Sequence, residues 1–198
     1  MLPFQLNIQN LSKSYNGLCI WKGLNLTLSS DHIYCLMGPS GVGKTTLLRI
    51  LLGLEQPDGG SFSLSPSQPY QMTAVFQEDR LSETFSPFDN VMAATRKSLS
   101  RNQVMAELCR LLPPESITRP VCTLSGGMKR RTAILRSLLT PSCSILMDEP
   151  FTGLDEDTKY QVIQYIKEKA GHRLLLISTH QEKDVDLLEG TLLRPFEG

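Results

Sequence analysis

Residues 33–54 read Ile-Tyr-Cys-Leu-Met-Gly-Pro-Ser-Gly-Val-Gly-Lys-Thr-Thr-Leu-Leu-Arg-Ile-Leu-Leu-Gly-Leu, and this stretch decides the fold. The apolar run Ile33–Met37 has the length of a buried strand and is followed at once by a glycine-rich turn. Over Thr46–Leu54 the leucines then recur at helical spacing, until Pro57 and Gly59 stop the pattern. A strand, a tight loop and a helix are therefore expected in this order.

The loop between this strand and helix fits the phosphate-binding pattern G-x-x-x-x-G-K-[ST] over Gly38–Thr45. Its glycines allow backbone N–H groups to surround phosphate oxygens, and the N-terminus of the following helix adds a favourable dipole. Lys44 is predicted to reach the β and γ phosphates, and the Thr45 hydroxyl is predicted to ligate Mg²⁺. The alternative interpretation is a glycine-rich turn with an exposed lysine. The predicted nucleotide-binding residues of this stretch are Gly38, Pro39, Ser40, Gly41, Val42, Gly43, Lys44, Thr45 and Thr46.

Alternating strands and helices continue toward the C-terminus. Short apolar runs at Ser144–Met147 and Leu174–Ile177 predict strands, and the charged segment Glu156–Ala170 between them predicts a helix. A further helix, Gln181–Leu188, and a strand, Thr191–Arg194, are expected after them. This alternation is typical of a parallel sheet that is covered by helices on both faces.

Two parts of the chain depart from this alternation. Residues 81–122 contain no strand pattern, and Ser100 with Gln103 has the form of a capping box that opens a helix ending at Leu112. We interpret this part as a small helical insertion. Residues 61–70 lie in a stretch rich in serine, proline and glycine and are expected to hold a trimmed set of short strands.

Composition limits the class of protein. The 198 residues include 20 Lys plus Arg, 20 Asp plus Glu and 40% apolar residues, which is typical of an ordinary globular chain. Zero net charge without long basic runs gives no support for a nucleic-acid partner. The most apolar stretch, Leu47–Leu54, contains Arg49 and is far shorter than a membrane span. Five cysteines without zinc-type spacing, and a start without signal-peptide character, favour a cytosolic protein whose role at any membrane is peripheral.

Two acids follow the apolar run Ser144–Met147, in the sequence Asp148-Glu149-Pro150. At the carboxyl end of a strand beside the phosphate loop, Asp148 is predicted to hold Mg²⁺ through water. Glu149 is predicted to face the γ-phosphate as the base that orients the attacking water. In isolation, an acidic pair in a solvated turn would be the alternative.

The segment Leu124–Arg130, Leu-Ser-Gly-Gly-Met-Lys-Arg, distinguishes among proteins with a phosphate loop. Ser125 is a good N-cap, and Gly126 and Gly127 permit close backbone approach at the start of the following helix. This segment resembles the L-S-G-G-Q signature of the ATP-binding-cassette (ABC) ATPases. The resemblance implies that it completes the ATP site of a second copy, in a head-to-tail dimer that encloses two nucleotides. Met128 replaces the commonest Gln, so no side-chain hydrogen bond to the nucleotide is carried over from that position.

Four more positions match the same family in order along the chain. Tyr15 matches the aromatic residue that stacks on adenine, and Gln77 matches the glutamine that contacts Mg²⁺ and the attacking water. Asp155 matches the D-loop, which makes a contact across the dimer, and His180 matches the switch histidine at the γ-phosphate. The resemblance thus implies catalytic roles for Glu149, His180 and Gln77, nucleotide binding by Tyr15, Ser125, Gly126, Gly127 and Asp155, and metal binding by Thr45, Gln77 and Asp148.

Two groups of residues allow more than one interpretation. Lys129, Arg130 and Arg131 lie at the start of the signature helix and form either a solvated basic face or a device that attracts phosphate. Phe85 and Phe88 either belong to the core of the insertion or line a groove that receives a helix from a membrane partner.

Over the whole chain, the resemblance implies an α/β P-loop NTPase fold. The expected fold has a mostly parallel central sheet, an N-terminal antiparallel β part and a small helical insertion. It implies a single domain over residues 1–198, with an ATP-binding core of residues 1–78 and 122–198 and an insertion of residues 79–121.

The function implied is that of an ATP-binding and ATP-hydrolysing subunit of a bacterial ABC transporter. Glu78–Leu124 leaves no room for the coiled-coil arm of chromosome-maintenance ATPases. Phe76–Leu81 and the signature are similar to importers of the nitrate, sulfonate and taurine group. The expected partners are transmembrane permease subunits, a second ATPase subunit and a substrate-binding protein, with the chain peripheral on the cytoplasmic face of the cell membrane. The alternative is a soluble ABC-type ATPase that acts in assembly or regulation.

Overall fold

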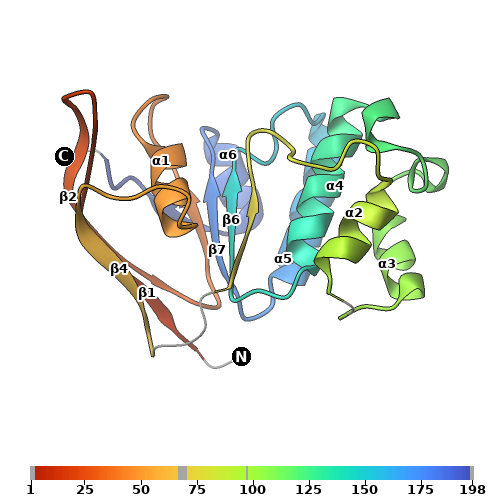
Figure 1. The fold of residues 1–198 in the computed structure, drawn as a ribbon, viewed down its shortest axis with the longest axis horizontal. Coiled ribbons are helices and arrows are strands. Elements are labelled where there is room, and N and C mark those ends of the chain that lie inside the picture. The colour runs from red at the N-terminus through yellow and green to blue at the C-terminus, as the bar shows by residue number, and fades with distance from the viewer. Residues whose placement is uncertain (1–2, 67–70, 97, 197–198) are drawn as a thin grey trace.

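The computed structural model describes residues 3–66, 71–96 and 98–196, and its centre is a five-stranded parallel sheet (Figure 1). The strands are β3 (Ile33–Leu36), β5 (Met72–Val75), β6 (Ser144–Asp148), β7 (Leu174–Ser178) and β8 (Thr191–Leu193). Their order is β5-β6-β7-β3-β8, and all neighbouring pairs are parallel. The predicted parallel sheet is confirmed. The loops that follow β3, β5, β6 and β7 therefore leave the sheet at one edge, where α/β proteins bind their ligands.

A three-stranded antiparallel sheet forms the N-terminal part, as predicted. It consists of β1 (Gln5–Tyr15), β2 (Leu18–Ser29) and β4 (Gly59–Ser65), in the order β2-β1-β4. A two-residue turn joins β1 to β2, and both of its residues, Asn16 and Gly17, have positive φ (50° and 81°). This is the geometry that the right-handed twist of a tight hairpin requires.

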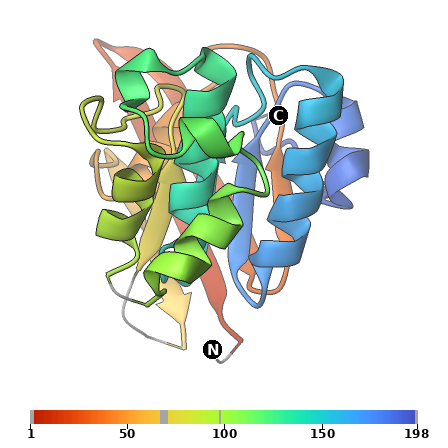
Figure 2. The same ribbon diagram turned by 90° about the vertical axis from the view of Figure 1, so that its right-hand side faces the viewer.

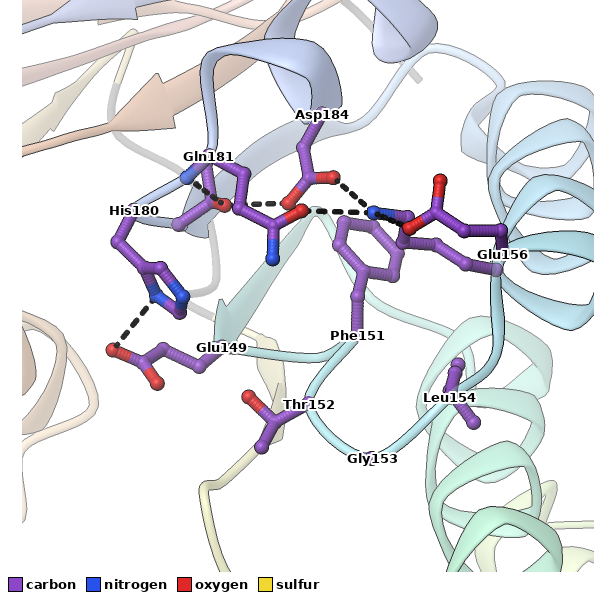
Figure 3. Close-up of a pocket in the computed structure, with 11 residues that line it drawn as sticks. Glu149, Phe151, Thr152, Gly153, Leu154, Glu156, His180, Gln181 and Asp184 are labelled. Atoms are coloured by element: carbon purple, nitrogen blue, oxygen red, sulfur yellow. Dashed lines mark hydrogen bonds and ion pairs between the residues drawn. The ribbon is translucent and has the colours of Figure 1, made fainter.

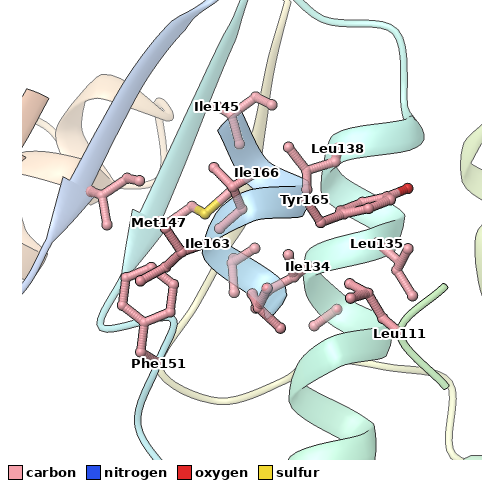
Figure 4. Close-up of a cluster of buried hydrophobic side chains, with 14 of the residues drawn as sticks. Leu111, Ile134, Leu135, Leu138, Ile145, Met147, Phe151, Ile163, Tyr165 and Ile166 are labelled. Atoms are coloured by element: carbon pink, nitrogen blue, oxygen red, sulfur yellow. The ribbon is translucent and has the colours of Figure 1, made fainter. Parts of the chain in front are cut away.

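Strand side chains alternate between two apolar cores, because successive residues of a strand point to opposite faces. Leu146 and Leu176 pack toward α1 and the antiparallel sheet, whereas Ile145 and Met147 pack toward the helices on the other face (Figure 4). The helices are α1 (Lys44–Leu51) on the first face and α4 (Gly126–Leu139), α5 (Glu156–Ala170) and α6 (Glu182–Leu188) on the second. The parallel sheet thus separates α1 from α4 (Figure 1).

The described residues of the predicted helical insertion contain two α-helices, α2 (Pro87–Ala94) and α3 (Arg101–Leu108), a 3₁₀ turn at Pro114–Ser116, and no strand. Figure 2 shows both helices in front of α4, on the side away from the antiparallel sheet. The capping box is confirmed, since Ser100 and Gln103 exchange backbone-to-side-chain hydrogen bonds of 3.3 and 2.8 Å. Helix α3 ends at Leu108 and not at the predicted Leu112, and turns follow it before Pro113, which disfavours helical geometry in the preceding residue.

Other boundaries differ by a few residues. Helix α1 begins at Lys44, within the phosphate loop, and ends at Leu51, before the predicted Leu54. Strand β4 covers part of the predicted 61–70 region, of which residues 67–70 lie outside the described part of the chain. Strand β5 is the strand that the family resemblance places before Gln77; its four residues show no clear alternation, so no local pattern sets its bounds. Among the described helices, none has the length and apolar character needed to cross a membrane.

Candidate ATP site

The phosphate loop lies between β3 and α1, as predicted. Lys44 is 7% exposed, and its ammonium group donates hydrogen bonds to the carbonyl oxygens of Gly38 (2.7 Å) and Pro39 (3.0 Å). The lysine charge is therefore held over the loop. Gly41 and Gly43 both have positive φ, 82° and 101°, which glycine adopts at no steric cost.

Gly43 is also required by a close approach. A Cβ atom at this position would lie 2.3 Å from Nε1 of Trp21 and 2.6 Å from Cγ2 of Ile20. Trp21, the single tryptophan of the chain, is buried on β2 beneath the loop, and its ring stacks on Phe196 with a centroid distance of 6.4 Å. Nothing in the residues around Trp21 indicates this contact, which joins segments more than 20 positions apart.

The two predicted acids stand at the end of β6. The Thr45 hydroxyl donates a 2.7 Å hydrogen bond to one carboxylate oxygen of Asp148, and the Ser178 hydroxyl donates one of 2.6 Å to the other. The backbone N–H of Glu149 in turn donates to Ser178 Oγ (2.9 Å). Asp148 and Thr45 thus present adjacent hydroxyl and carboxylate oxygens, the hard ligands that suit Mg²⁺.

Ser178 is a residue that sequence analysis missed. It pairs directly with Asp148 in the parallel register of β6 and β7 and ends its strand at the same level. A polar residue that ends one apolar strand beside the acid that ends its neighbour was the available signal.

Glu149 and His180 are brought together at the same edge of the sheet. His180 Nδ1 lies 3.8 Å from Glu149 Oε1. Glu149 has a φ of 46°, a conformation that is uncommon for residues other than glycine and aims its side chain away from the strand. A depression of about 360 Å³ is lined by Gln77, by Glu149 and by the loop and helix residues Ser40, Gly41, Gly43, Lys44, Thr45 and Thr46. Three separately predicted motifs therefore meet in one depression.

A second cavity, of about 210 Å³, lies between Glu149, His180 and the turn at residues 151–154 (Figure 3). At its far side, the Lys159 ammonium contacts Asp184 (3.1 Å) and Gln181 (2.9 Å). Burial acts to lower the pKa of Lys159, but its ion pairs outweigh burial and hold the pKa above its usual value. Thr179 donates to Asp184 (2.6 Å), so the segment that carries His180 is fastened to both α5 and α6.

The signature segment begins α4 as predicted. Ser125 caps the helix and accepts the N–H of Met128 (3.3 Å). The Cα of Gly127 faces the turn before α5, since a Cβ there would lie 3.6 Å from a methyl group of Leu154. Asp155 caps α5 through the N–H of Thr158 (2.8 Å). The signature and the D-loop position thus lie side by side, across the sheet from the α1 that follows the phosphate loop (Figure 1).

The interpretation of residues 129–131 as a solvated basic face is wrong for Arg130. This side chain is 7% exposed, donates to the carbonyl of Phe76 (2.6 Å) and to that of Gln77, and pairs with Asp79 at 3.3 Å. Arg131 is half-buried and donates to the carbonyl of Leu111. Tertiary packing of α4 against the segment after β5 overrides the local charge pattern.

Tyr15 lies beside the phosphate loop, where its hydroxyl donates to the Glu55 carboxylate and lies 3.5 Å from Thr46 Oγ1. Its ring is 41% exposed, with the Lys13 ammonium 5.1 Å from the centroid. The two phenylalanines of the insertion separate: Phe88 is 5% exposed and belongs to the core, whereas Phe85 is 50% exposed. Only Phe85 is therefore available to line a groove for a helix of a membrane partner.

This arrangement defines a nucleotide-binding cassette of the P-loop type. The family model of the ABC transporters matches residues 21–152, and the chain belongs to this family. It is an ATP-binding cassette with the ATP-hydrolase chemistry of that family, as the sequence predicted.

Named relatives carry the likeness over most of the chain. It is 35% identical to the aliphatic sulfonates import ATP-binding protein SsuB 3 of Rhodococcus jostii, over 93% of this chain and 67% of that relative. It is 29% identical to the spermidine/putrescine import ATP-binding protein PotA of Mesoplasma florum, over 92% of this chain and 56% of that protein. A solved dimeric ATP-binding cassette bound to ADP and Pi superposes with a TM-score of 0.82 at 24% identity, over 96% of this chain and 95% of that one. This last likeness confirms the fold.

Proposed function

We propose that this chain is the ATP-hydrolysing subunit that energises an ABC importer. The observation that carries the proposal is the depression in which the phosphate loop, Gln77 and Glu149 meet, beside the hydrogen-bonded pair Thr45 and Asp148. The import proteins named above support the class of transporter. Their cargoes differ, so the proposal leaves the choice of cargo to the permease and its substrate-binding protein.

In this proposal the phosphate loop holds the β and γ phosphates. The Lys44 ammonium leaves the carbonyls of Gly38 and Pro39 and pairs with phosphate oxygens, a charge-assisted contact in a dry site. The partly exposed Tyr15 ring receives adenine. Thr45 and Asp148, together with Gln77, would hold Mg²⁺, and the ion would supply positive charge that neutralises the phosphates.

Hydrolysis follows from the acid that stands beside the phosphate loop. Glu149 accepts the proton of a water that attacks the γ-phosphorus, and His180 contacts the γ-phosphate from the neighbouring strand. The bond to the bridging oxygen breaks, and ADP and phosphate are the products. The depression holds Glu149 and the phosphate loop but is open to solvent, so a lid is needed to complete the site over ATP and to exclude water.

We propose that a second copy of the chain supplies this lid. Ser125, Gly126, Gly127 and Asp155 of one copy would close the phosphate loop of the other, because in its own chain the signature lies across the sheet from α1. ATP then closes the dimer and hydrolysis opens it. Residues 79–121 would act as the insertion, and residues 1–78 and 122–198, which include the signature, would form the core.

A permease is the proposed membrane partner, and it would hold the chain at the cytoplasmic face of the membrane. Phe85 offers an exposed ring in the segment between Gln77 and α2. Phe85→Glu is expected to reduce membrane recruitment and leave ATP hydrolysis intact. Tyr160→Glu, which alters an equally exposed ring on α5, is the matched control. Equal recruitment of the two variants would contradict this docking site, and a chain that never associates with membranes would favour an assembly or regulatory ATPase.

The activity itself is tested by phosphate release from ATP. Lys44→Ala is expected to abolish tight ATP binding, and Glu149→Gln is expected to keep binding while turnover falls by roughly 10². ATP affinity that is unchanged in Lys44→Ala would contradict the assignment of the phosphate loop.

A further inference from the structure

Several backbone carbonyls in the segment after β5 accept hydrogen bonds from arginines of α4, the helix that begins with the signature. The carbonyls of Phe76 and Gln77 accept hydrogen bonds from Arg130. Six residues further along α4, Arg136 donates to the carbonyls of Arg80 (2.8 Å) and Asp79 (3.5 Å). Four of the five residues 76–80 are thus held by two arginines of one helix.

Arg130 is built to hold this segment rigidly. It is 7% exposed, both of its terminal nitrogens bond carbonyls, and its Nε lies 3.3 Å from the Asp79 carboxylate. A planar guanidinium presents its donors in a fixed fork, so that two carbonyls and a carboxylate define one orientation. Charge-assisted hydrogen bonds of this kind are stronger than neutral ones, and their loss leaves two partly buried carbonyls without the donor that fixes them.

The held segment carries a residue of the ATP site. Gln77 gives its carbonyl to Arg130, while the residue itself lines the depression with Glu149 and the phosphate loop. Because Arg130 fixes the backbone at Phe76 and Gln77, the Cα of Gln77 has one position from which its side chain extends toward the depression. Arg130 stands five residues after Ser125, so the same helix also carries the signature.

We propose that Arg130 is a positioning residue for ATP hydrolysis, which holds Gln77 in place and makes the glutamine segment and the signature helix move as one body. This inference rests on the proposed function. Arg136 gives a second support further along the segment. Arg130 acts through Gln77 and touches no reacting atom, so its loss affects turnover and metal use more than ATP binding.

The test measures hydrolysis in purified variants of the whole chain. Arg130→Gln is expected to lower kcat by about tenfold, as a small misplacement of a site residue does, and to raise the Mg²⁺ concentration needed for half-maximal activity. ATP binding without Mg²⁺, followed by Trp21 fluorescence, is expected to stay within about twofold of the wild type. Arg130→Lys keeps the positive charge beside Asp79 but loses the planar guanidinium with its several donors. Its kcat is expected to lie between that of the wild type and that of Arg130→Gln.

Arg173→Gln is the matched control for the loss of an arginine that binds backbone carbonyls; Arg173 itself is half-buried. Arg173 also donates to backbone carbonyls, those of Leu138, Lys169 and Ala170, but it lies at the opposite end of the sheet from the site. It is expected to lose stability while kcat and the Mg²⁺ requirement of the folded protein stay unchanged. A fall in kcat equal to that of Arg130→Gln would overturn the inference.

A double-mutant cycle with Gln77→Ala separates positioning from general damage. If Arg130 acts through Gln77, Arg130→Gln has no further effect on kcat once Gln77 is alanine. Additive losses, or a wild-type kcat in Gln77→Ala, would overturn the inference while the ATPase function stands. If the wild type shows no Lys44-dependent hydrolysis, the proposed function itself fails and the inference falls with it.

Discussion

Gly43→Ala tests the contact between the phosphate loop and the tryptophan beneath it. The added Cβ would lie 2.3 Å from Trp21 Nε1 and 2.6 Å from Ile20 Cγ2, where carbon contacts need about 3.5–4.0 Å. The indole is rigid and buried, so it must shift bodily. Overpacking of this kind costs about 1–3 kcal/mol.

Gly41→Ala is the control that removes the clash and keeps the backbone effect. Gly41 also has positive φ, but nothing lies within 4 Å of the place its Cβ would take. Both variants therefore carry the strain of a left-handed alanine, about 1–2 kcal/mol. Gly43→Ala alone adds the clash, so it should be the less stable of the two by about 1–3 kcal/mol.

Urea unfolding followed by circular dichroism measures this difference, and Trp21 fluorescence reports the displacement. The emission maximum is expected to move to longer wavelength in Gly43→Ala and to stay unchanged in Gly41→Ala. Trp21→Leu, which removes the ring, should recover part of the lost stability in the Gly43→Ala background. Equal stability of the two alanine variants, with unchanged emission in both, would refute the contact.

Three further predictions concern single groups. Asp148→Asn should weaken the Mg²⁺-dependent part of ATP binding and leave binding in EDTA unchanged, because the altered group is a proposed metal ligand; an equal loss under both conditions in a titration would contradict that role. Burial, aided by the nearby Asp184 charge, raises the pKa of Cys35 to about 12, so this thiol stays protonated at neutral pH. A thiol reagent should therefore modify the exposed Cys19, Cys109 and Cys122 in native protein well before Cys35, and simultaneous loss of all five thiols would contradict the fold. The hydrogen bond from Arg110 lowers the pKa of Glu168 from 4.5 to about 2, so the pair stabilises the fold above pH 4.5 and loses this effect as pH falls toward 2; the difference in Tm between wild type and Glu168→Gln should shrink over that range, and a constant difference would count against the pair.

The features that the sequence predicts well are those that a local pattern carries. The glycine-rich loop, the capping box at Ser100 and the helix Glu156–Ala170 each depend on residues a few positions apart, and the structure has all three. The acids at the end of β6 were placed by the rule that ligand groups gather at the carboxyl ends of parallel strands. The order of the family motifs along the chain then predicted that the phosphate loop, Gln77, Glu149 and His180 come together.

The residues that sequence analysis missed act through contacts between distant segments. Arg130 looks like one cation in a basic run, and only the packing of α4 against residues 76–79 buries it. The contact of Ser178 with Asp148 depends on the register of β7 with β6. The contact of Trp21 with Gly43 depends on where the antiparallel sheet lies under the phosphate loop. Neither register nor sheet packing can be read from a single stretch of sequence.

The central claim is that each ATP site is built from two copies of the chain. A mixture of two inactive variants tests it most directly: Ser125→Arg, which spoils the signature, and Glu149→Gln, which removes the base. In the mixed dimer, one site combines an intact Glu149 with an intact Ser125. Half of the dimers in an equal mixture are mixed and each has one such site, so activity up to about a quarter of the wild type is predicted. A mixture no more active than the two variants measured apart would contradict the shared site.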